Sequence, residues 1–346
     1  MIKMKRMNHI LRSIAVLPML AAVLLAPSCS KNKGENANEA AKRQFEAWRS
    51  LHYPAAVEKD GIYIIDETPG NGLEWLESMP VTFMTYTIRS LDGTISYNTD
   101  ERWARQLGNW DQTYYYGPQT VITGKDYSYA GMDAMLDGMR EGGSRTAIIP
   151  SWMFTYDRYD SSAEYEKHET DATPMIYTIT FLGQAENFGE YELENLRRYA
   201  SRNWQVSDTL STGAVFFKSF TEFDSEPVEM RSDTTVYINY VGRRISDGQV
   251  FDTNIADTAK FYHIYNSSRN YAPVSVTWAD KADEIKMNQS SIISGFAIGL
   301  FNMHADEKAS FAFGNGLGYG SSGGTNTHMV PPYASLRFDV EMVPEP

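Results

Sequence analysis

The residue types that carry most enzyme chemistry are scattered in this 346-residue chain. The six histidines include no pair at metal-ligand spacing, and no cysteine lies beside any of them. We therefore expect no metal site and no cofactor. The glycine-rich run at 314–320 lacks the lysine and the following helix of a nucleotide-binding loop. Carboxylate pairs such as Glu164 and Glu166 stand in a polar, tyrosine-rich stretch, which we interpret as a solvated loop.

The only cysteine, Cys29, follows a segment with the layout of a secretory signal. Basic residues precede an apolar run from about Ile14 to Ala26, which is shorter than the roughly 18 residues that argue for a membrane span. Residues 25–29 resemble a lipobox, in which the signal is cut before a cysteine that takes a diacylglycerol. Ala26 and Pro27 depart from the usual pattern. We expect residues 1–28 to be removed and Cys29 to anchor the chain to a membrane.

The chain is acidic, with a formal net charge of -13 that becomes -17 when the four basic residues of the signal are lost. Such a surface repels phosphates, so no nucleic-acid partner is expected. A lone cysteine excludes intrachain disulfides, and ordinary apolar cores must therefore stabilise the remaining 318 residues. This length suggests two domains.

The sequence contains an internal repeat. The strand-like segment 81–86 ahead of Asp92-Gly93 corresponds to 235–240 ahead of Asp247-Gly248. Gly61 and Gly213 are 152 residues apart, Tyr86 and Tyr240 are 154 apart, and Met139 and Met303 are 164 apart. Order and spacing are kept over a long distance, which predicts two copies of one domain.

Each copy shows the same elements. An alternating strand runs into an Asp-Gly hairpin turn, and a short apolar helix follows Gly131 in the first copy and Gly295 in the second. The last strand, 336–342, alternates apolar and charged residues, as half-buried antiparallel strands do. Helices are also expected from Ala40 and around 188–202. The pattern predicts an α+β fold, with a curved antiparallel sheet wrapped round a short helix in each copy.

Four motifs of the second copy, in order, resemble an FKBP-type peptidyl-prolyl cis-trans isomerase. They are Tyr240-Val241-Gly242, the run 247–252 that ends in Phe251-Asp252, the run 292–296 with Gly299 and Met303, and Gly318-Tyr319-Gly320. The segment 330–341 completes the set. The resemblance covers about residues 231–343, interrupted by a long insertion between Asp252 and Ile292. It implies two tandem FKBP-like domains, of which the first is degenerate, in a lipoprotein of the type found in Bacteroidota.

The resemblance also implies a proline pocket in the second copy. The backbone N–H of Ile293 and the hydroxyl of Tyr319 would hold peptide carbonyls, and Asp252 would orient the pocket edge. Phe296 stands where the family commonly has a tryptophan. The insertion leaves one aromatic position unassigned, with Tyr271, Val274 and Val276 as candidates. The implied pocket and catalytic residues are Tyr240, Phe251, Asp252, Ile292, Ile293, Phe296, Tyr319 and Phe338.

The expected division of the chain is a signal peptide at 1–28, a lipidated tether and helix at 29–60, a degenerate FKBP-like domain at 61–183, a helical linker at 184–212 and an isomerase domain at 213–346. The expected clients are proline-containing exported polypeptides. The basic residues Lys31 and Lys33 after Cys29 favour the periplasmic face of the cell envelope. The sequence leaves the oligomeric state open. It also leaves two alternatives to the enzyme: an FKBP-like binding or chaperone lipoprotein without turnover, and a structural component of surface assembly.

Overall fold

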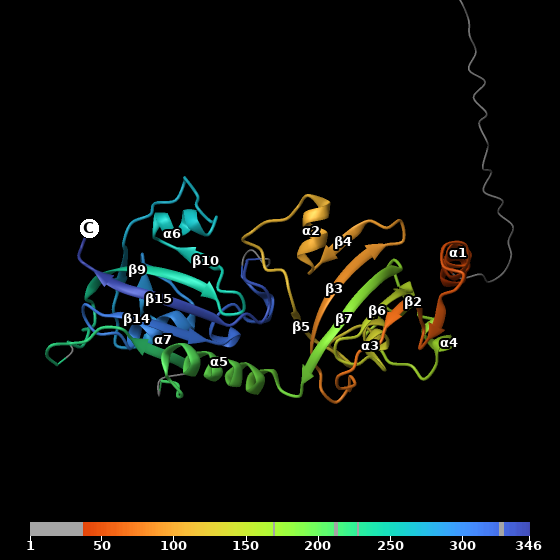
Figure 1. The fold of residues 1–346 in the computed structure, drawn as a ribbon, viewed down its shortest axis with the longest axis horizontal. Helices are drawn as coiled ribbons and strands as arrows, with labels where there is room; N and C mark the ends of the chain where they lie inside the picture. Colours follow the sequence, from red (N-terminus) through yellow and green to blue (C-terminus); the bar gives the residue numbers. More distant parts are fainter. Residues whose placement is uncertain (1–36, 169, 211–213, 227, 325–328) are drawn as a thin grey trace, which may run out of the picture. The chain divides into compact units, whose positions relative to one another are not determined.

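The computed structural model describes residues 37–168, 170–210, 214–226, 228–324 and 329–346. The predicted signal and Cys29 lie outside the described residues. Within those residues, no helix combines the length and the apolar character that a membrane crossing requires. Two antiparallel sheets organise the chain, one in residues 37–185, here called the first lobe, and one in residues 188–346, the second lobe (Figure 1).

The first lobe is built on a sheet in the order β1-β2-β6-β7-β3-β4, with β5 also paired to β3. Its longest pairing joins β3 and β7, which run antiparallel from Val81 opposite Ala185 to Ser90 opposite Met175. The strands are β1 Val57–Lys59, β2 Ile62–Thr68, β3 Val81–Ser90, β4 Ile95–Asn98, β5 Gln119–Ile122, β6 Ser144–Ile149 and β7 Met175–Ala185.

The second lobe repeats this arrangement in the order β13-β12-β11-β9-β15-β14-β8, with β10 paired to β9. The series β2, β6, β7, β3 of the first lobe corresponds to β8, β14, β15, β9 of the second. The two copies therefore share one topology, and the predicted α+β fold with tandem FKBP-like domains is confirmed. The strands are β8 Val215–Ser219, β9 Thr235–Arg244, β10 Val250–Thr253, β11 Val274–Thr277, β12 Lys286–Met287, β13 Ser290–Ser291, β14 Lys308–Phe313 and β15 Leu336–Val343.

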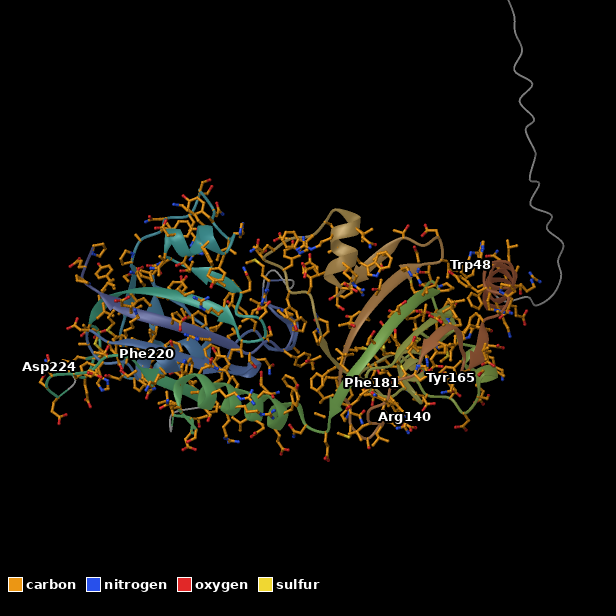
Figure 2. All side chains as sticks on the ribbon, in the orientation of Figure 1. Trp48, Arg140, Tyr165, Phe181, Phe220 and Asp224 are labelled. Atoms are coloured by element: carbon orange, nitrogen blue, oxygen red, sulfur yellow. The ribbon has the colours of Figure 1, made fainter. Side chains whose placement is uncertain are left out.

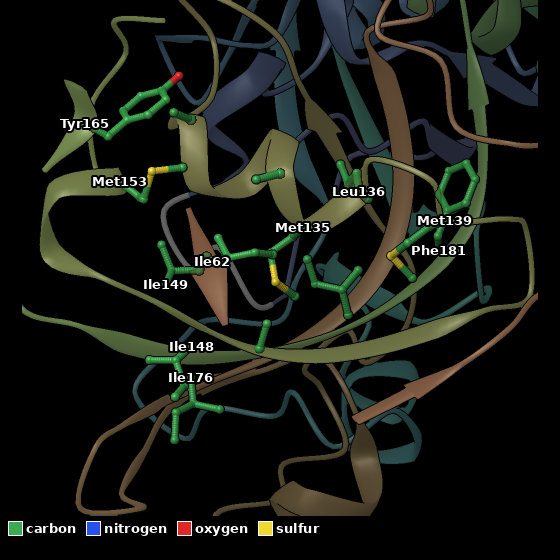
Figure 3. Close-up of a cluster of buried hydrophobic side chains, with 14 of the residues drawn as sticks. Ile62, Met135, Leu136, Met139, Ile148, Ile149, Met153, Tyr165, Ile176 and Phe181 are labelled. Carbon is green, nitrogen blue, oxygen red and sulfur yellow. The ribbon is translucent and has the colours of Figure 1, made fainter. Parts of the chain in front are cut away.

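Each sheet packs against one short helix, as the sequence predicts. In the first lobe Met135, Leu136 and Met139, in and just after the helix, are buried together with Ile148 and Phe181 of the sheet (Figure 3). Both short helices begin around a glycine that the sheet contacts closely. The described helices are α1 Ala37–His52, α2 Glu101–Leu107, α3 Ala130–Leu136, α4 Ser162–Tyr165, α5 Phe188–Trp204, α6 Ala256–Phe261 and α7 Ser294–Phe301.

The two cores place their large side chains on different elements: on the strand in the second lobe and on the helix in the first. A Cβ on Gly299 of α7 would lie 2.3 Å from the Phe311 ring, so only glycine fits against that phenylalanine. At the matching positions of the first lobe, the helix carries the buried Met135 and the strand carries the buried Ala147. A large residue has moved from the strand to the helix, which keeps the interior filled.

Two expectations about the segments around the sheets can be compared with the structure. The sequence left open which domain the helix around 188–202 packs on; α5 buries Leu196, Ala200 and Trp204 in one cluster with Phe216 and Ala312 of the second lobe. The prediction that Glu164 and Glu166 lie in a solvated loop is correct only in part. Glu164 is exposed but lies in the short helix α4, and Glu166 is half-buried and forms an ion pair with Lys42 of α1.

Candidate functional site

A stack of phenylalanine rings fills the centre of the second lobe. Phe296 of α7 and Phe338 of β15 lie with ring centroids 4.4 Å apart and nearly parallel. Phe313 of β14 also stacks on Phe338, with ring centroids 5.9 Å apart. Phe296 is 2% exposed and Phe338 is 3% exposed. These rings therefore form a rigid apolar floor rather than an open surface.

Above this floor, the half-buried ring of Phe251 forms a wall. It meets Phe338 edge-on with centroids 5.7 Å apart, and it meets Tyr319 edge-on with centroids 6.1 Å apart. Gly242 of β9 makes room for this arrangement, because a Cβ there would lie 2.8 Å from Phe338 and 3.0 Å from Phe251. The glycine of the Tyr-Val-Gly motif is thus required by close packing of two rings.

A polar network borders the rings on one side. The Tyr240 hydroxyl donates to Asp252 Oδ2 over 2.8 Å. Arg269 donates to Asp252 Oδ1 over 2.5 Å and to the Tyr240 hydroxyl oxygen over 2.9 Å. Burial, with the neighbouring Asp252 carboxylate, raises the pKa of Tyr240 far above its usual value, so the phenol stays protonated and remains a donor.

Arg269 belongs to the insertion between Asp252 and Ile292, and no sequence motif singles it out. Although its burial opposes the charge, the hydrogen bonds to Asp252 raise the pKa of Arg269. Its partners are 17 and 29 residues away in the sequence, so no local pattern marks it. The Asp252 carboxylate in turn accepts hydrogen bonds from two side chains of the site, Tyr240 and Arg269.

The backbone just before α7 supplies the next component. Ile293 has an extended conformation at the helix N-cap, with φ -63° and ψ 144°, and its carbonyl accepts from the Phe296 N–H over 3.1 Å. Among the described residues, no acceptor is found for the Ile293 N–H. The side chains of Ile292 and Ile293 are half-buried and pack against the apolar cluster that contains Phe296 and Phe338.

The structure thus brings the eight residues selected from the sequence to one place, at two depths. Tyr240, Phe296 and Phe338 are buried and support the site from below. Phe251, Ile292, Ile293 and Tyr319 are half-buried and reach the surface. Burial, followed by the Asp252 charge, raises the pKa of Tyr319, so its hydroxyl is also a neutral donor. The arrangement offers a partly exposed apolar surface with hydrogen-bond donors at its edge.

The structure separates the three candidates for the unassigned aromatic position of the pocket. Val276 of β11 is fully buried in the core, so it does not line a surface site. Tyr271 stacks on Tyr265 with ring centroids 5.0 Å apart, and the Arg269 guanidinium lies 5.7 Å from the Tyr271 ring centre. Val274 of β11 is half-buried against the same core as the phenylalanine floor.

In the first lobe, the residues that align with Phe251 and Asp252 are shifted by one position from those that equal spacing along the chain indicates. Equal spacing after Tyr86 and Tyr240 would pair Tyr97-Asn98 with Phe251-Asp252, but the strand register contradicts this pairing. Tyr97 lies opposite Ile88, as Asp252 lies opposite Gly242. An independent marker agrees, because the Tyr86 N–H donates to Thr99 Oγ1 over 2.9 Å as the Tyr240 N–H donates to Asn254 Oδ1 over 2.8 Å.

In this register, other residues of the first lobe take the positions of the Phe251 wall and of Gly242. Ser96, exposed at the surface, takes the position of the Phe251 wall, and Ile88 takes the position of Gly242. The Tyr97 ring stacks on Tyr86 with centroids 5.2 Å apart, where the second lobe has the Asp252 carboxylate. The first lobe therefore lacks both the wall and the carboxylate of the second.

Comparison with known proteins agrees with this geometry. Residues 226–343 match the family model of the FKBP-type peptidyl-prolyl cis-trans isomerases. The chain is 27% identical over 137 residues to FK506-binding protein 2 of Kluyveromyces lactis, covering 37% of this chain and 81% of that protein. The second lobe thus holds an FKBP-type isomerase domain. The protein is accordingly an enzyme, a peptidyl-prolyl cis-trans isomerase.

Solved structures of FKBP proteins are similar to this chain at lower identity. FkpA from Escherichia coli is 24% identical, with 44% of this chain and 57% of that chain covered and a TM-score of 0.30. The three FKBP domains of wheat FKBP73 are 13% identical, with 82% of this chain and 94% of that chain covered and a TM-score of 0.28.

Proposed function

We propose that the second lobe isomerises X-Pro bonds of exported polypeptides at the apolar surface formed by Phe251, Ile292, Ile293 and Tyr319 over the phenylalanine floor. The observation that carries this proposal is the convergence of half-buried Phe251, Ile293 and Tyr319 on the buried Phe296–Phe338 stack. The hydrogen-bond network of Tyr240, Asp252 and Arg269 borders the same surface.

The chemistry of proline isomerisation matches such a site. The barrier to rotation about a peptide bond is about 18–20 kcal/mol because the planar amide is stabilised by resonance. Both isomers of an X-Pro bond are populated, since they differ by only about 0.5–1 kcal/mol. No bond is made or broken, so a nucleophile is unnecessary. An apolar surface removes water from the planar amide, whose dipole water solvates well, and so lowers the barrier to the twisted form.

The donors at the edge position the peptide. In the proposal, the Ile293 N–H and the Tyr319 hydroxyl donate to carbonyls on the two sides of the proline, while the ring sits against Phe251 and the floor. These contacts restrict the chain to a conformation from which the amide can rotate. Each 1.4 kcal/mol by which they favour the twisted amide gives about a tenfold faster exchange.

The test is a proline-turnover assay on the Phe251→Ala variant. We expect kcat/KM to fall by at least about tenfold, because the wall that excludes water is lost. The fold should remain, since a half-buried ring contributes less than the roughly 3–5 kcal/mol of a fully buried phenylalanine. Phe220→Ala, an exposed phenylalanine of the same lobe (Figure 2), is the matched control and should retain full turnover. Normal activity per folded Phe251→Ala molecule would remove Phe251 from the site.

The alternative of a non-catalytic FKBP-like binding protein has an observation in its favour within the first lobe. Ser96 and Ile88 replace the wall and the close-packed glycine there, so a polypeptide bound at that place would meet an open, tyrosine-rich surface. We propose that the first lobe binds rather than turns over. The proposed location is the cell envelope, with Cys29 lipidated and the lobes on the periplasmic side, supported by the signal-like sequence and the basic residues after Cys29.

A further inference from the structure

The loop that carries Tyr319 leaves and re-enters the second sheet at one place. β14 ends at Phe313 and β15 begins at Leu336, and these two residues are partners in the strand register. The start and the end of the loop therefore lie next to each other. The residues that flank the pair are here called the loop neck: Gly314, Asn315 and Ser335.

Glu192 of α5 binds both sides of the loop neck. Its Oε1 accepts from the Asn315 N–H over 2.7 Å and from the Ser335 hydroxyl over 2.8 Å. Its Oε2 accepts from the Asn315 side-chain amide over 2.8 Å. The carboxylate approaches so closely that a Cβ on Gly314 would lie 2.3 Å from Oε2, so this position requires glycine. One side chain thus holds the start of the loop to its end.

Glu192 takes a position on α5 that packing alone would give to an apolar residue. It is 9% exposed and continues the buried stripe of Leu196, Ala200 and Trp204 on the same face of the helix. These apolar residues pack in one cluster with β8 and β14, alongside which α5 runs (Figure 1). A buried carboxylate costs free energy unless hydrogen bonds replace the lost water. The bonds to the loop neck provide that replacement, so Glu192 and the neck fix each other.

A single tight turn connects the neck to Tyr319. Residues 315–317 form a 3-10 turn, and the Gly318 N–H donates to the Asn315 carbonyl over 2.9 Å. The turn also lies close against the sheet, because a Cβ on Gly318 would be 3.1 Å from the Leu336 side chain. Tyr319 follows directly. A shift of the neck therefore moves the Tyr319 hydroxyl.

The first lobe holds its corresponding loop differently. Helix α1 lies beside Ser151 and Pro174, which flank the paired ends of β6 and β7. A groove of about 790 Å³ lies between them, and its lining on the helix side is uncharged: Ala41, Gln44, Phe45 and Trp48. The fold therefore does not require a carboxylate from the helix at this place. Glu192 belongs to the lobe that holds the isomerase site.

We infer that Glu192 is a positioning residue of the isomerase site, which sets where the Tyr319 hydroxyl lies by holding the loop neck. The inference rests on the proposed function, since Tyr319 affects turnover only if its hydroxyl donates to the bound peptide. Displacement of a catalytic group by about 1 Å can slow a reaction by roughly a hundredfold. A loosened neck therefore lowers turnover even when the lobe stays folded.

Hydrogen exchange tests the contact between Glu192 and the neck without reference to turnover. In Glu192→Leu the side chain continues the apolar stripe but cannot accept, so amides of 314–318 should exchange at least about tenfold faster than in wild type. Amides of β9 should keep their protection, which shows that the lobe still folds. Glu194→Leu, the same change at an exposed position of α5, is the control and should leave 314–318 unchanged. Unchanged exchange at 314–318 in Glu192→Leu would overturn the inference.

Turnover of a proline peptide by the full chain tests whether Glu192 acts through Tyr319. We expect Glu192→Leu to lower kcat/KM by about fivefold and Tyr319→Phe to lower it by about tenfold. Glu192→Gln keeps an accepting oxygen and should lose less than about twofold. In the Tyr319→Phe background, Glu192→Leu should have little further effect, because the hydroxyl that it positions is absent. A further loss of about fivefold in that background would overturn the inference, since Glu192 would then act on the fold alone.

Phe251→Ala separates this inference from the proposed function. Wild-type turnover in Phe251→Ala would contradict the proposed function, and the inference with it. Reduced turnover in Phe251→Ala and Tyr319→Phe, together with wild-type kcat/KM in Glu192→Leu, would leave the proposed function standing and overturn the inference alone.

Discussion

Arg269 illustrates how a single side chain completes the polar edge of the isomerase site. It holds Asp252 and Tyr240 at once, so the carboxylate is fixed in place and its charge is balanced. Arginine suits this position because its planar guanidinium donates to two acceptors in a set geometry, whereas lysine offers a point charge.

We therefore predict that Arg269→Gln lowers kcat/KM for a proline peptide by about two- to fivefold. Both side chains of the pair are more than a third exposed, so its loss costs up to about 1 kcal/mol, and the carboxylate becomes free to reorient. Arg269→Lys should fall between wild type and Arg269→Gln. Arg231→Gln removes an exposed arginine of the same lobe and serves as the control. Wild-type turnover in Arg269→Gln would mean that the edge network has no part in the reaction.

Gly242 allows a prediction about stability rather than turnover. A methyl group at Gly242 would press on Phe338 and Phe251, both within 3.0 Å of the added carbon. Overpacking of this kind costs about 1–3 kcal/mol, so Gly242→Ala should lower the free energy of unfolding in urea by that amount. Gly316→Ala meets open space and should change it by less than about 0.5 kcal/mol. Equal stability of the two variants would contradict the close packing of the rings.

At the scale of the elements, periodicity predicted most of the fold correctly. The hairpin turns at Asp92-Gly93 and Asp247-Gly248 are present, and both glycines have positive φ, at 90° and 73°. The last strand buries Leu336, Phe338 and Val340 as its alternation indicated. These features are local, so a residue's own neighbours decide them.

The failures of the sequence interpretation have two physical origins. The turn between β3 and β4 is one residue shorter than the turn between β9 and β10, and each hairpin contains a bulge, so counting along the chain misplaced Tyr97 by one position. Arg269 was missed because its partners are distant in the sequence. Only the folded insertion brings its guanidinium to Asp252.

The half-buried Tyr177 of the first sheet leads to a prediction about pH. Burial raises the pKa of Tyr177 to about 12, from an unfolded value near 10. Between these values the folded state holds a proton that the unfolded state has lost, so stability is complete below pH about 10 and falls as pH rises towards about 12. Tyr177→Phe should flatten this part of the curve of unfolding free energy against pH. An identical decline in the variant would show that Tyr177 does not contribute.

At the scale of the whole molecule, the proposed lipid anchor predicts a change in partitioning. A lipoprotein carries two or three acyl chains, whereas one chain gives only marginal membrane binding. The mature protein should therefore partition into detergent, and Cys29→Ala should leave the precursor uncut or the product in the aqueous phase. Wild-type protein found wholly in the aqueous phase would contradict the anchor.

The last prediction is that the two lobes divide their roles, with turnover confined to the second. The first lobe has Ser96 where the second has the Phe251 wall, and Tyr97 where the second has Asp252. The first lobe also has Met132 where the second has Phe296, and a flexible thioether defines a floor less well than a ring does. A site without a wall and with a mobile floor admits water, which restores the solvation of the planar amide that catalysis must remove.

The full chain carrying Phe251→Ala and Tyr319→Ala tests this division, because these substitutions weaken the site of the second lobe and leave the first lobe unchanged. We expect turnover to fall by about a hundredfold, as two contacts to the twisted amide are lost. The reciprocal variant Tyr86→Phe/Tyr97→Phe removes the hydroxyls from the first lobe's stacked pair and should leave turnover unchanged. Circular dichroism of both variants checks that the sheets remain. Turnover above about a third of wild type in the folded second-lobe variant would contradict this division of roles. Loss of the second lobe's site would then leave a substantial rate.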